Sequence, residues 1–117
     1  MKDGARNHHA GLAAEDSVLR QYLTQGYRLL ARRWRGLGGE LDLVLGKGDA
    51  VIFVEVKKSR CFDRALGLLG GTQVQRLFQT AEQYLGTCRA GLNTPSRLDV
   101  ALVNELGEVR VIENALA

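Results

Sequence analysis

The sequence predicts one α/β domain in which a mixed β-sheet is flanked by helices, with the element order α-β-β-β-α-β-β. Two segments, one near the start and one from about residue 72, carry apolar residues at helical spacing. Runs rich in β-branched residues, bounded by glycine-containing turns, lie between and after them. With 117 residues, 45% of them hydrophobic and 25% charged, the chain can form one core. We expect residues 11–117 to form this domain and residues 1–10 to be a flexible N-terminus.

The first half of the chain predicts one helix and two strands. Residues 11–25 form an amphipathic helix, because five apolar residues fall on one side of a helical wheel, and Gly26 follows as its end. These residues are Leu12, Val18, Leu19, Tyr22 and Leu23. Residues 27–34 mix leucines with arginines in a short strand. Glycines at 36, 38 and 39 then break the chain before a second strand over residues 40–45.

The second half begins with the strongest β pattern of the chain, residues 50–57. Residues 46–49 supply the turn of a hairpin, which we expect to be centred between Lys47 and Gly48. Thr72 and Gln75 have the spacing of a capping box at the start of a second helix. Its buried stripe consists of Val74, Leu77, Phe78, Ala81, Tyr84 and Leu85. Residues 98–103 and 108–112 form a final hairpin.

Charge and cysteine usage limit the classes of function. A net charge of +3 and a pI near 9.1 permit a nucleic-acid partner without establishing one. Cys61 and Cys88 lie far apart and in no metal-binding pattern, so we expect free thiols in a reducing compartment. No apolar run approaches the roughly 20 residues that a membrane span requires. We therefore expect a cytoplasmic protein that does not contact a membrane.

The strand at residues 50–57 carries an unusual charged pair. Glu55 and Lys57 share a face with Val51 and Phe53, because side chains two apart on a strand point the same way. With the turn centred as above, Glu40 lies opposite Glu55. Asp42 then lies opposite Phe53 and diagonal to Glu55, and such diagonal neighbours are about 7–8 Å apart. Their carboxylates can converge on one cation, although alternating charges on a strand are more often a solvated face.

Glu15 adds a third acid, because it sits near the centre of the apolar stripe of the first helix. A buried carboxylate must be paired, protonated or metal-bound, so an inward Glu15 needs a partner such as the hairpin site. Mg²⁺ (or Mn²⁺) prefers oxygen ligands, and it both stabilises charge on phosphate and lowers the pKa of bound water. Asp42 and Glu55 would be the ligands. Lys57 would orient or deprotonate the water and stabilise the transition state.

Asp42, twelve intervening residues and then Glu55-Val56-Lys57 together resemble the core motif of the PD-(D/E)xK nuclease superfamily. A longer pattern, covering residues 10 to 114, resembles the YraN family of uncharacterised bacterial proteins. The matching segments are Gly11–Glu15, Gly26–Tyr27, Gly39–Leu43, Phe53–Lys57, Ala81–Leu85 and Arg97–Val100. The resemblance implies a restriction endonuclease-like fold similar to archaeal Holliday-junction resolvases, in which a helix glutamate joins the strand carboxylates and lysine. Its implied catalytic residues are Glu15, Asp42, Glu55 and Lys57, with Glu15 as a further metal ligand.

Three positions depart from the pattern of the family. Gln73 stands where a basic residue is expected at the start of the second helix, and Leu41 and Leu98 replace isoleucine and phenylalanine. The leucines are packing substitutions, whereas the glutamine could weaken a phosphate contact. Gln73 is either an accessory residue of the site or a surface residue. Glu40 is either a ligand or a carboxylate that binds backbone donors at the hairpin entry.

Two basic clusters flank the hairpin and suit contacts with the phosphate backbone. They consist of Arg28, Arg32, Arg33 and Arg35, and of Lys58, Arg60 and Arg64. We expect DNA contacts from Arg32, Arg33, Arg35, Lys58 and Arg60, although exposed arginines are common on small basic domains. Arg97 and Asp99 are expected to pair with each other or with nearby loops, and Trp34 to lie in the core.

Three functions remain open. The first is a magnesium-dependent endonuclease that hydrolyses phosphodiester bonds in structured or branched DNA. The second is a non-catalytic nucleic-acid-binding module of nuclease ancestry, acting in DNA repair or recombination, and the third is a structural interaction protein. Retention of all three acids favours the first. A homodimer is possible, and the apolar residues 66–69 could form its interface or fold over the site.

Overall fold

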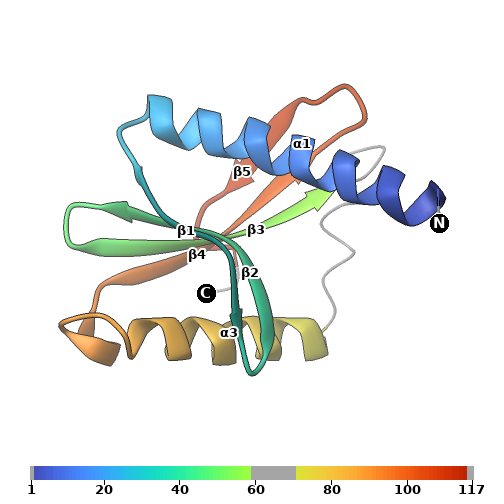
Figure 1. Cartoon of the computed structure of the whole chain (residues 1–117). Coiled ribbons are helices and arrows are strands. Elements are labelled where there is room, and N and C mark those ends of the chain that lie inside the picture. Colours follow the sequence, from blue (N-terminus) through green and yellow to red (C-terminus); the bar gives the residue numbers. More distant parts are fainter. Residues whose placement is uncertain (1, 59–70, 116–117) are drawn as a thin grey trace.

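The computed structural model describes residues 2–58 and 71–115, with side chains from residue 12 onward in the first helix. A β-sheet forms the middle layer, α1 lies on one face, and α3 lies on the other (Figure 1). Within these residues, no helix combines the length and apolarity needed to cross a membrane.

The elements follow the predicted order, with small differences at their ends. The helices are α1 (Lys2–Thr24) and α3 (Gly71–Leu85), with a short 3-10 helix η1 (Gly91–Asn93) after α3. The strands are β1 (Arg28–Gly36), β2 (Gly39–Lys47), β3 (Ala50–Lys58), β4 (Ser96–Val103) and β5 (Val109–Ile112).

The described strands form one mixed sheet in the order β1-β2-β3-β4-β5. β1 and β2, β2 and β3, and β4 and β5 pair antiparallel, as tight hairpin connections allow. β3 and β4 are parallel, and the connection between them includes α3, as a parallel pair requires a crossover. The prediction of an α/β fold with a mixed sheet flanked by helices is confirmed.

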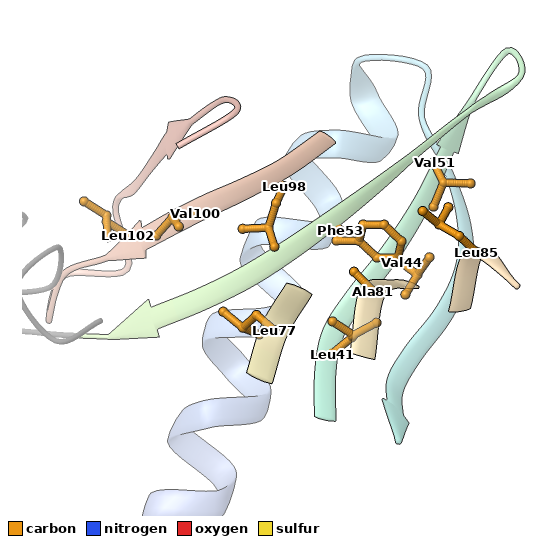
Figure 2. Packing of buried hydrophobic residues seen from close by; sticks show 10 residues of the cluster. All are labelled: Leu41, Val44, Val51, Phe53, Leu77, Ala81, Leu85, Leu98, Val100 and Leu102. Carbon is orange, nitrogen blue, oxygen red and sulfur yellow. The ribbon is translucent and has the colours of Figure 1, made fainter. Parts of the chain in front are cut away.

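Each face of the sheet has its own apolar core. On the α3 face, strand residues such as Phe53 and Leu98 pack against Leu77, Ala81 and Leu85 of the helix (Figure 2). On the α1 face, helix and strand residues pack together, namely Ala14, Val18, Tyr22, Tyr27, Leu43, Leu45, Ile52, Val54, Ala101 and Val103. Because both faces are covered, the central strand β3 is almost continuously buried.

The helices differ from the prediction in three ways. α1 begins at Lys2, well before the expected start at Gly11, since extending a packed helix costs less than starting one. The expected flexibility of residues 1–10 stays a prediction. Thr72 lies inside the first turn of α3, so its assignment as the N-cap is wrong. Phe78 is 41% exposed, and Thr80 takes a buried place on α3 instead.

The register of the β2–β3 hairpin also differs from the prediction, by two residues. Lys47 pairs with Ala50 and Leu43 with Val54, so the turn consists of Gly48 and Asp49. Gly48 has φ +58°, which suits the first position of a two-residue hairpin loop, where glycine avoids steric strain. A shift of two preserves which face each residue occupies. Asp42 is therefore next to Glu55 rather than diagonal to it.

Candidate active site

The candidate site lies where β2 and β3 separate, which we call the fork. Pairing between these strands ends at Leu43 and Val54, while β2 continues along β1 and β3 continues along β4. Leu41 and Val44 both pack on the α3 face although they are three residues apart, so strict alternation breaks near Asp42. The fork therefore opens the sheet at Asp42 and Glu55.

Asp42 and Glu55 face each other across the fork. The Val56 amide donates a hydrogen bond of 2.8 Å to Oδ2 of Asp42, so the carboxylate takes the place of a backbone partner where pairing has ended. The carboxyl groups of Asp42 and Glu55 lie within hydrogen-bonding reach of each other. Glu55 is 8% exposed. The predicted convergence of these two acids is present in the structure, at closer range than expected.

Burial makes both acids reluctant to ionise, and the charge of Asp42 adds to this effect on Glu55. Burial raises the pKa of Asp42, and the neighbouring charge of Glu15 raises it further, whereas the Val56 amide lowers it. Burial together with the charge of Asp42 raises the pKa of Glu55 to about 8, against the lowering effect of Lys57. Lys57 therefore offsets only part of the cost of ionising this pair.

Lys57 is the cation that accompanies Glu55 on β3. Its Nζ lies 3.5 Å from Oε1 of Glu55, and its side chain is 18% exposed. Glu55 and Lys57 are two residues apart on one strand, so both project toward the α3 face, as the sequence predicts. The ammonium thus has limited solvent contact and a fixed position beside the carboxyl pair.

Glu15 reaches the same region from α1, but its carboxylate is bound by arginines of β1. The side chain is buried, as predicted, and its two oxygens accept hydrogen bonds of 3.2 and 3.0 Å from Nε and Nη2 of Arg33. Nη2 of Arg32 lies 3.4 Å from Oε1 of Glu15, while Nη1 of Arg32 binds Asp16 at 2.9 Å. Glu15 therefore finds the partner that its burial demands, but in Arg33 rather than in a cation at the hairpin.

A cleft of about 490 Å³ opens beside Glu55 on the α3 face. The β1–β2 hairpin forms one wall and α3 the other, and Figure 1 shows this hairpin running across α3. Its lining residues are Gly38, Glu40, Glu55, Thr72, Gln73, Arg76, Leu77 and Thr80. The structure thus brings both predicted accessory residues, Glu40 and Gln73, to the site. Glu40 binds Arg35 at 3.0 Å, so it is paired with a cation as it stands.

The donor set fits a hard divalent cation in part. Asp42 and Glu55 supply neighbouring carboxylate oxygens, the ligand type that Mg²⁺ and Mn²⁺ prefer, and burial is the main cause of their raised pKa values. Across residues 12–58 and 71–115, no group of three Asp, Glu, His or Cys side chains is gathered closely enough to hold an ion. Asp42 and Glu55 are therefore the two acids that the fork brings together, while Glu15 is bound to Arg33.

The basic residues predicted to contact DNA have different surroundings. Arg32, Arg33 and Arg35 all bind acids of this domain, with side chains 30, 34 and 80% exposed. Lys58 is exposed at the end of β3. Arg60, Arg64, Cys61 and the apolar residues 66–69 lie outside the described residues. Sequence reasoning missed the pairing of Arg33 with Glu15, although an inward acid close to an arginine-rich strand was a usable signal.

A second polar network, away from the fork, fastens α1 to β4. Asp99 is fully buried and accepts hydrogen bonds from Tyr22, Arg97 and the amide of Asn114, at 2.7 to 3.0 Å. Burial and Asp99 raise the pKa of Tyr22, and bonds to Asp99 and Tyr27 raise that of Arg97. The predicted Arg97–Asp99 pair is confirmed. Trp34 packs edge-on against Tyr84 at 5.3 Å beside the α3-face core, also as predicted.

Comparison with known proteins identifies the family. The model of the uncharacterised protein family UPF0102 matches residues 14–103, which include all four predicted catalytic residues. A UPF0102 protein of Ruegeria pomeroyi is 53% identical over 96% of this chain and 91% of its own length. One from Roseobacter denitrificans is 50% identical over 97% and 88%, and one from Cereibacter sphaeroides strain KD131 is 46% identical over 97% of both chains. This family is the one that the sequence resembles under the name YraN, and the chain belongs to UPF0102.

Proposed function

We propose that this protein is a metal-dependent endonuclease that hydrolyses phosphodiester bonds in structured or branched DNA. The observation that carries the proposal is the meeting of Asp42 and Glu55 at the fork, with Nζ of Lys57 3.5 Å from Glu55. If these residues served stability alone, placing two acids together would gain little. Replacing buried charged groups with apolar residues of similar size is often neutral or stabilising. Restriction endonuclease-like ancestry belongs to the same proposal.

Each residue has a distinct role in this reading. Asp42 and Glu55 would hold Mg²⁺ or Mn²⁺, which supplies Lewis acidity toward phosphate and a bound water of lowered pKa. The Val56 amide orients Asp42, because its hydrogen bond holds Oδ2 in place. Lys57 donates to the attacking water or to a phosphate oxygen, where a positioned ammonium acts mainly in the transition state. Gln73 and Arg76 line the cleft, where they can contact phosphates next to the cleaved one.

The surroundings of the fork support a nucleic-acid substrate. The cleft opens beside Glu55 and offers donors from Arg76, Gln73 and Thr72. Lys58 at the end of β3 and the guanidinium of Arg35 on β1 are also exposed. Contacts of this kind bind phosphate without reading sequence, so they suit a substrate recognised by its shape. Such a substrate places the protein in the cytoplasm.

The test is cleavage of defined DNA structures. The purified protein is incubated with single-stranded, duplex, flapped and four-way-junction DNA under Mg²⁺ or Mn²⁺, beside the Asp42→Asn protein. We expect cleavage by the wild type and none by Asp42→Asn, since the amide keeps the shape but loses the charge that holds the metal. Equal cleavage by both proteins would point to a contaminating nuclease and defeat the assignment.

The second candidate is a binding module of the same ancestry that no longer cuts. The pairing of Glu15 with Arg33 favours it, because the third acid is engaged and the metal site has two ligands as it stands. This module would bind the same DNA structures in EDTA as in Mg²⁺. Absence of cleavage on every substrate with either metal, together with such binding, would establish it in place of the enzyme.

A further inference from the structure

Arg33 is held in an unusual conformation at the fork. Its φ is +51°, in the left-handed region that non-glycine residues rarely adopt because of steric strain. Trp34 and Arg32 of β1 pair with Leu41 and Leu43 of β2. Arg33 therefore lies opposite Asp42 of β2. Such a conformation persists only when its surroundings hold it. Here the guanidinium makes a two-pronged contact with Glu15.

This contact decides what Glu15 can do. Glu15 belongs to the buried side of α1 and is 5% exposed, so its carboxylate requires a charged partner. Its charge raises the pKa of Asp42, so Glu15 acts on one of the two acids of the fork. With both oxygens on Arg33, however, Glu15 cannot bind a cation at the fork without giving up at least part of this contact.

The guanidinium of Arg33 faces solvent as well as Glu15. Its side chain is 34% exposed, and it lies on β1, next to the fork where a DNA phosphate would lie. A guanidinium binds carboxylate and phosphate with the same paired geometry. A phosphate can therefore replace Glu15 on Arg33 with no change in the number of charged contacts that Arg33 makes.

We infer that Arg33 is a positioning residue that exchanges Glu15 for a substrate phosphate. In the free protein Arg33 holds Glu15, and the metal site has two protein ligands, Asp42 and Glu55. When a nucleic-acid phosphate takes Arg33, Glu15 is released to become the third ligand. The complete site then forms only in the presence of substrate. The inference rests on the proposed function, because it assigns how that same site is assembled.

The exchange requires that metal and nucleic acid strengthen each other's binding through Arg33. By linkage, the factor by which DNA raises metal affinity equals the factor by which metal raises DNA affinity. Removing Arg33 releases Glu15 permanently. The free protein should then bind metal more tightly, and the coupling between metal and DNA should shrink by about the same factor.

The first measurement is Mn²⁺ affinity of the free protein by electron paramagnetic resonance. We expect Arg33→Gln to bind Mn²⁺ about fivefold or more tightly than the wild type. The double variant Arg33→Gln with Glu15→Asp keeps the charge of Glu15 but shortens its reach, so it should return to near wild-type affinity. Arg89→Gln, which removes the same charge from an exposed arginine after α3 and outside the fork, is the matched control and should stay within about twofold.

The second measurement is DNA affinity by fluorescence anisotropy, with Ca²⁺ as a metal chosen to prevent cleavage, and with EDTA. The increase in DNA affinity that Ca²⁺ causes should be smaller in Arg33→Gln than in the wild type. The two increases should differ by about the factor by which Arg33→Gln raises Mn²⁺ affinity. Circular dichroism checks that each variant is folded. Arg33→Lys keeps the charge without the paired contact, and it replaces Arg33→Gln if the latter is unfolded. The increase in its DNA affinity caused by Ca²⁺ should be intermediate.

Three outcomes overturn the inference. The first is that Arg33→Gln binds Mn²⁺ no more tightly than the wild type. The second is that the double variant keeps the full increase in Mn²⁺ affinity. The third is that the coupling between metal and DNA is unchanged in Arg33→Gln. The second of these would mean that Arg33 acts through its charge alone. If any of the three occurs while Asp42→Asn still abolishes Mn²⁺ binding, the proposed exchange is wrong and the proposed metal site stands. If no variant binds Mn²⁺, the metal site fails and the exchange fails with it.

Discussion

At the level of single residues, the main feature is a pair of acids that the fold places together at a cost. Asp42 and Glu55 come from strands that separate where these two residues stand, and the charge of Asp42 raises the cost of ionising Glu55. Lys57 offsets part of this cost from the same strand. The free protein should therefore be less stable when Glu55 is charged than when it is neutral.

This cost predicts how stability depends on pH. Glu55 has a folded-state pKa of about 8, above its ordinary value of 4.5, so the folded protein holds the proton more tightly than the unfolded chain. Its contribution is fully present below about pH 4.5 and is lost as the pH rises to about 8. Since one pKa unit corresponds to about 1.4 kcal/mol, the loss is on the order of a few kcal/mol.

Urea denaturation in EDTA at pH 5, 6.5 and 8 tests this expectation. Residue 55 cannot ionise in the Glu55→Gln variant. The free energy of unfolding of this variant, relative to that of the wild type, should therefore increase from pH 5 to pH 8. Glu82→Gln serves as the control, because Glu82 is an exposed acid of α3. A constant difference between wild type and Glu55→Gln across this range would show that Glu55 titrates normally. Addition of Mn²⁺ at pH 8 should narrow the difference if the fork binds metal.

Sequence reasoning identified Asp42, Glu55 and Lys57 but not their exact geometry. Alternation along β3 was enough to place Glu55 and Lys57 on one face. The register depended on whether Gly48 occupies the first or the second position of the turn, which composition alone did not decide. Arg33 was assigned to DNA because nothing local shows that its backbone adopts a positive φ or that α1 brings Glu15 to it.

At the level of elements, long-range polar contacts decide how the helices sit on the sheet. Asp99 joins Tyr22 of α1, Arg97 of β4 and the backbone after β5. Tyr22 and Asp99 are 77 residues apart, so no local pattern could predict their bond. The prediction of the Arg97–Asp99 pair succeeded because these residues are neighbours on one face of one strand.

The Asp99 network should contribute strongly to stability. Asp99→Ala leaves Arg97 and Tyr22 without their shared partner and should cost about 3–5 kcal/mol. Tyr22→Phe removes one bond to a charged acceptor and should cost about 1.5–3 kcal/mol. Urea denaturation measures both, with Tyr84→Phe as a control that removes the same hydroxyl from a half-buried tyrosine. If Tyr22→Phe costs no more than Tyr84→Phe, the hydrogen bond to Asp99 adds nothing to stability.

The β1–β2 hairpin is seated directly on α3, which forms the cleft wall. A Cβ atom at Gly38 would clash with the Arg76 carbonyl oxygen and would lie 2.6 Å from Oγ1 of Thr80. The Leu37 amide also donates a hydrogen bond of 2.6 Å to Oε1 of Gln83. The glycines here were read from the sequence as a chain break, whereas in the structure Gly38 permits close packing of backbone on helix.

Gly38→Ala should therefore destabilise the protein by about 1–3 kcal/mol, the usual cost of forcing atoms into a packed contact. Gly71→Ala is the matched control, because a Cβ atom at that position meets nothing within 4 Å. It should be neutral or slightly stabilising in a helix. Urea denaturation of both variants provides the comparison. Equal stabilities would indicate that the hairpin moves away from α3 without loss.

At the level of the whole molecule, DNA affinity and catalytic rate depend on different sets of charges. Affinity sums many phosphate contacts, each of which contributes a slope of about −0.9 to the dependence of log K on log salt. The net charge of +3 is modest, and three arginines near the fork are paired with acids. Rate depends instead on the few groups at the cleaved phosphate.

Lys57 and Lys58 separate these two properties, because they are adjacent in sequence and lie in different surroundings. Lys57 projects to the α3 face beside Glu55, whereas Lys58 is exposed at the end of β3. Lys57→Met should reduce the cleavage rate at saturating DNA by about 10²–10³, the typical effect of removing one positioned electrostatic group. Its affinity for DNA should fall only slightly, since one partly buried cation adds little to the total.

Lys58→Met should show the opposite pattern, with a near wild-type rate at saturating DNA and a salt slope reduced by about 1. Single-turnover cleavage and anisotropy titrations at several salt concentrations measure both quantities on the same proteins. Lys57 also lowers the pKa of Glu55, so the rates are compared at saturating Mn²⁺ to exclude a simple loss of metal. If Lys57→Met cuts as fast as Lys58→Met, the ammonium beside Glu55 has no part in the chemistry.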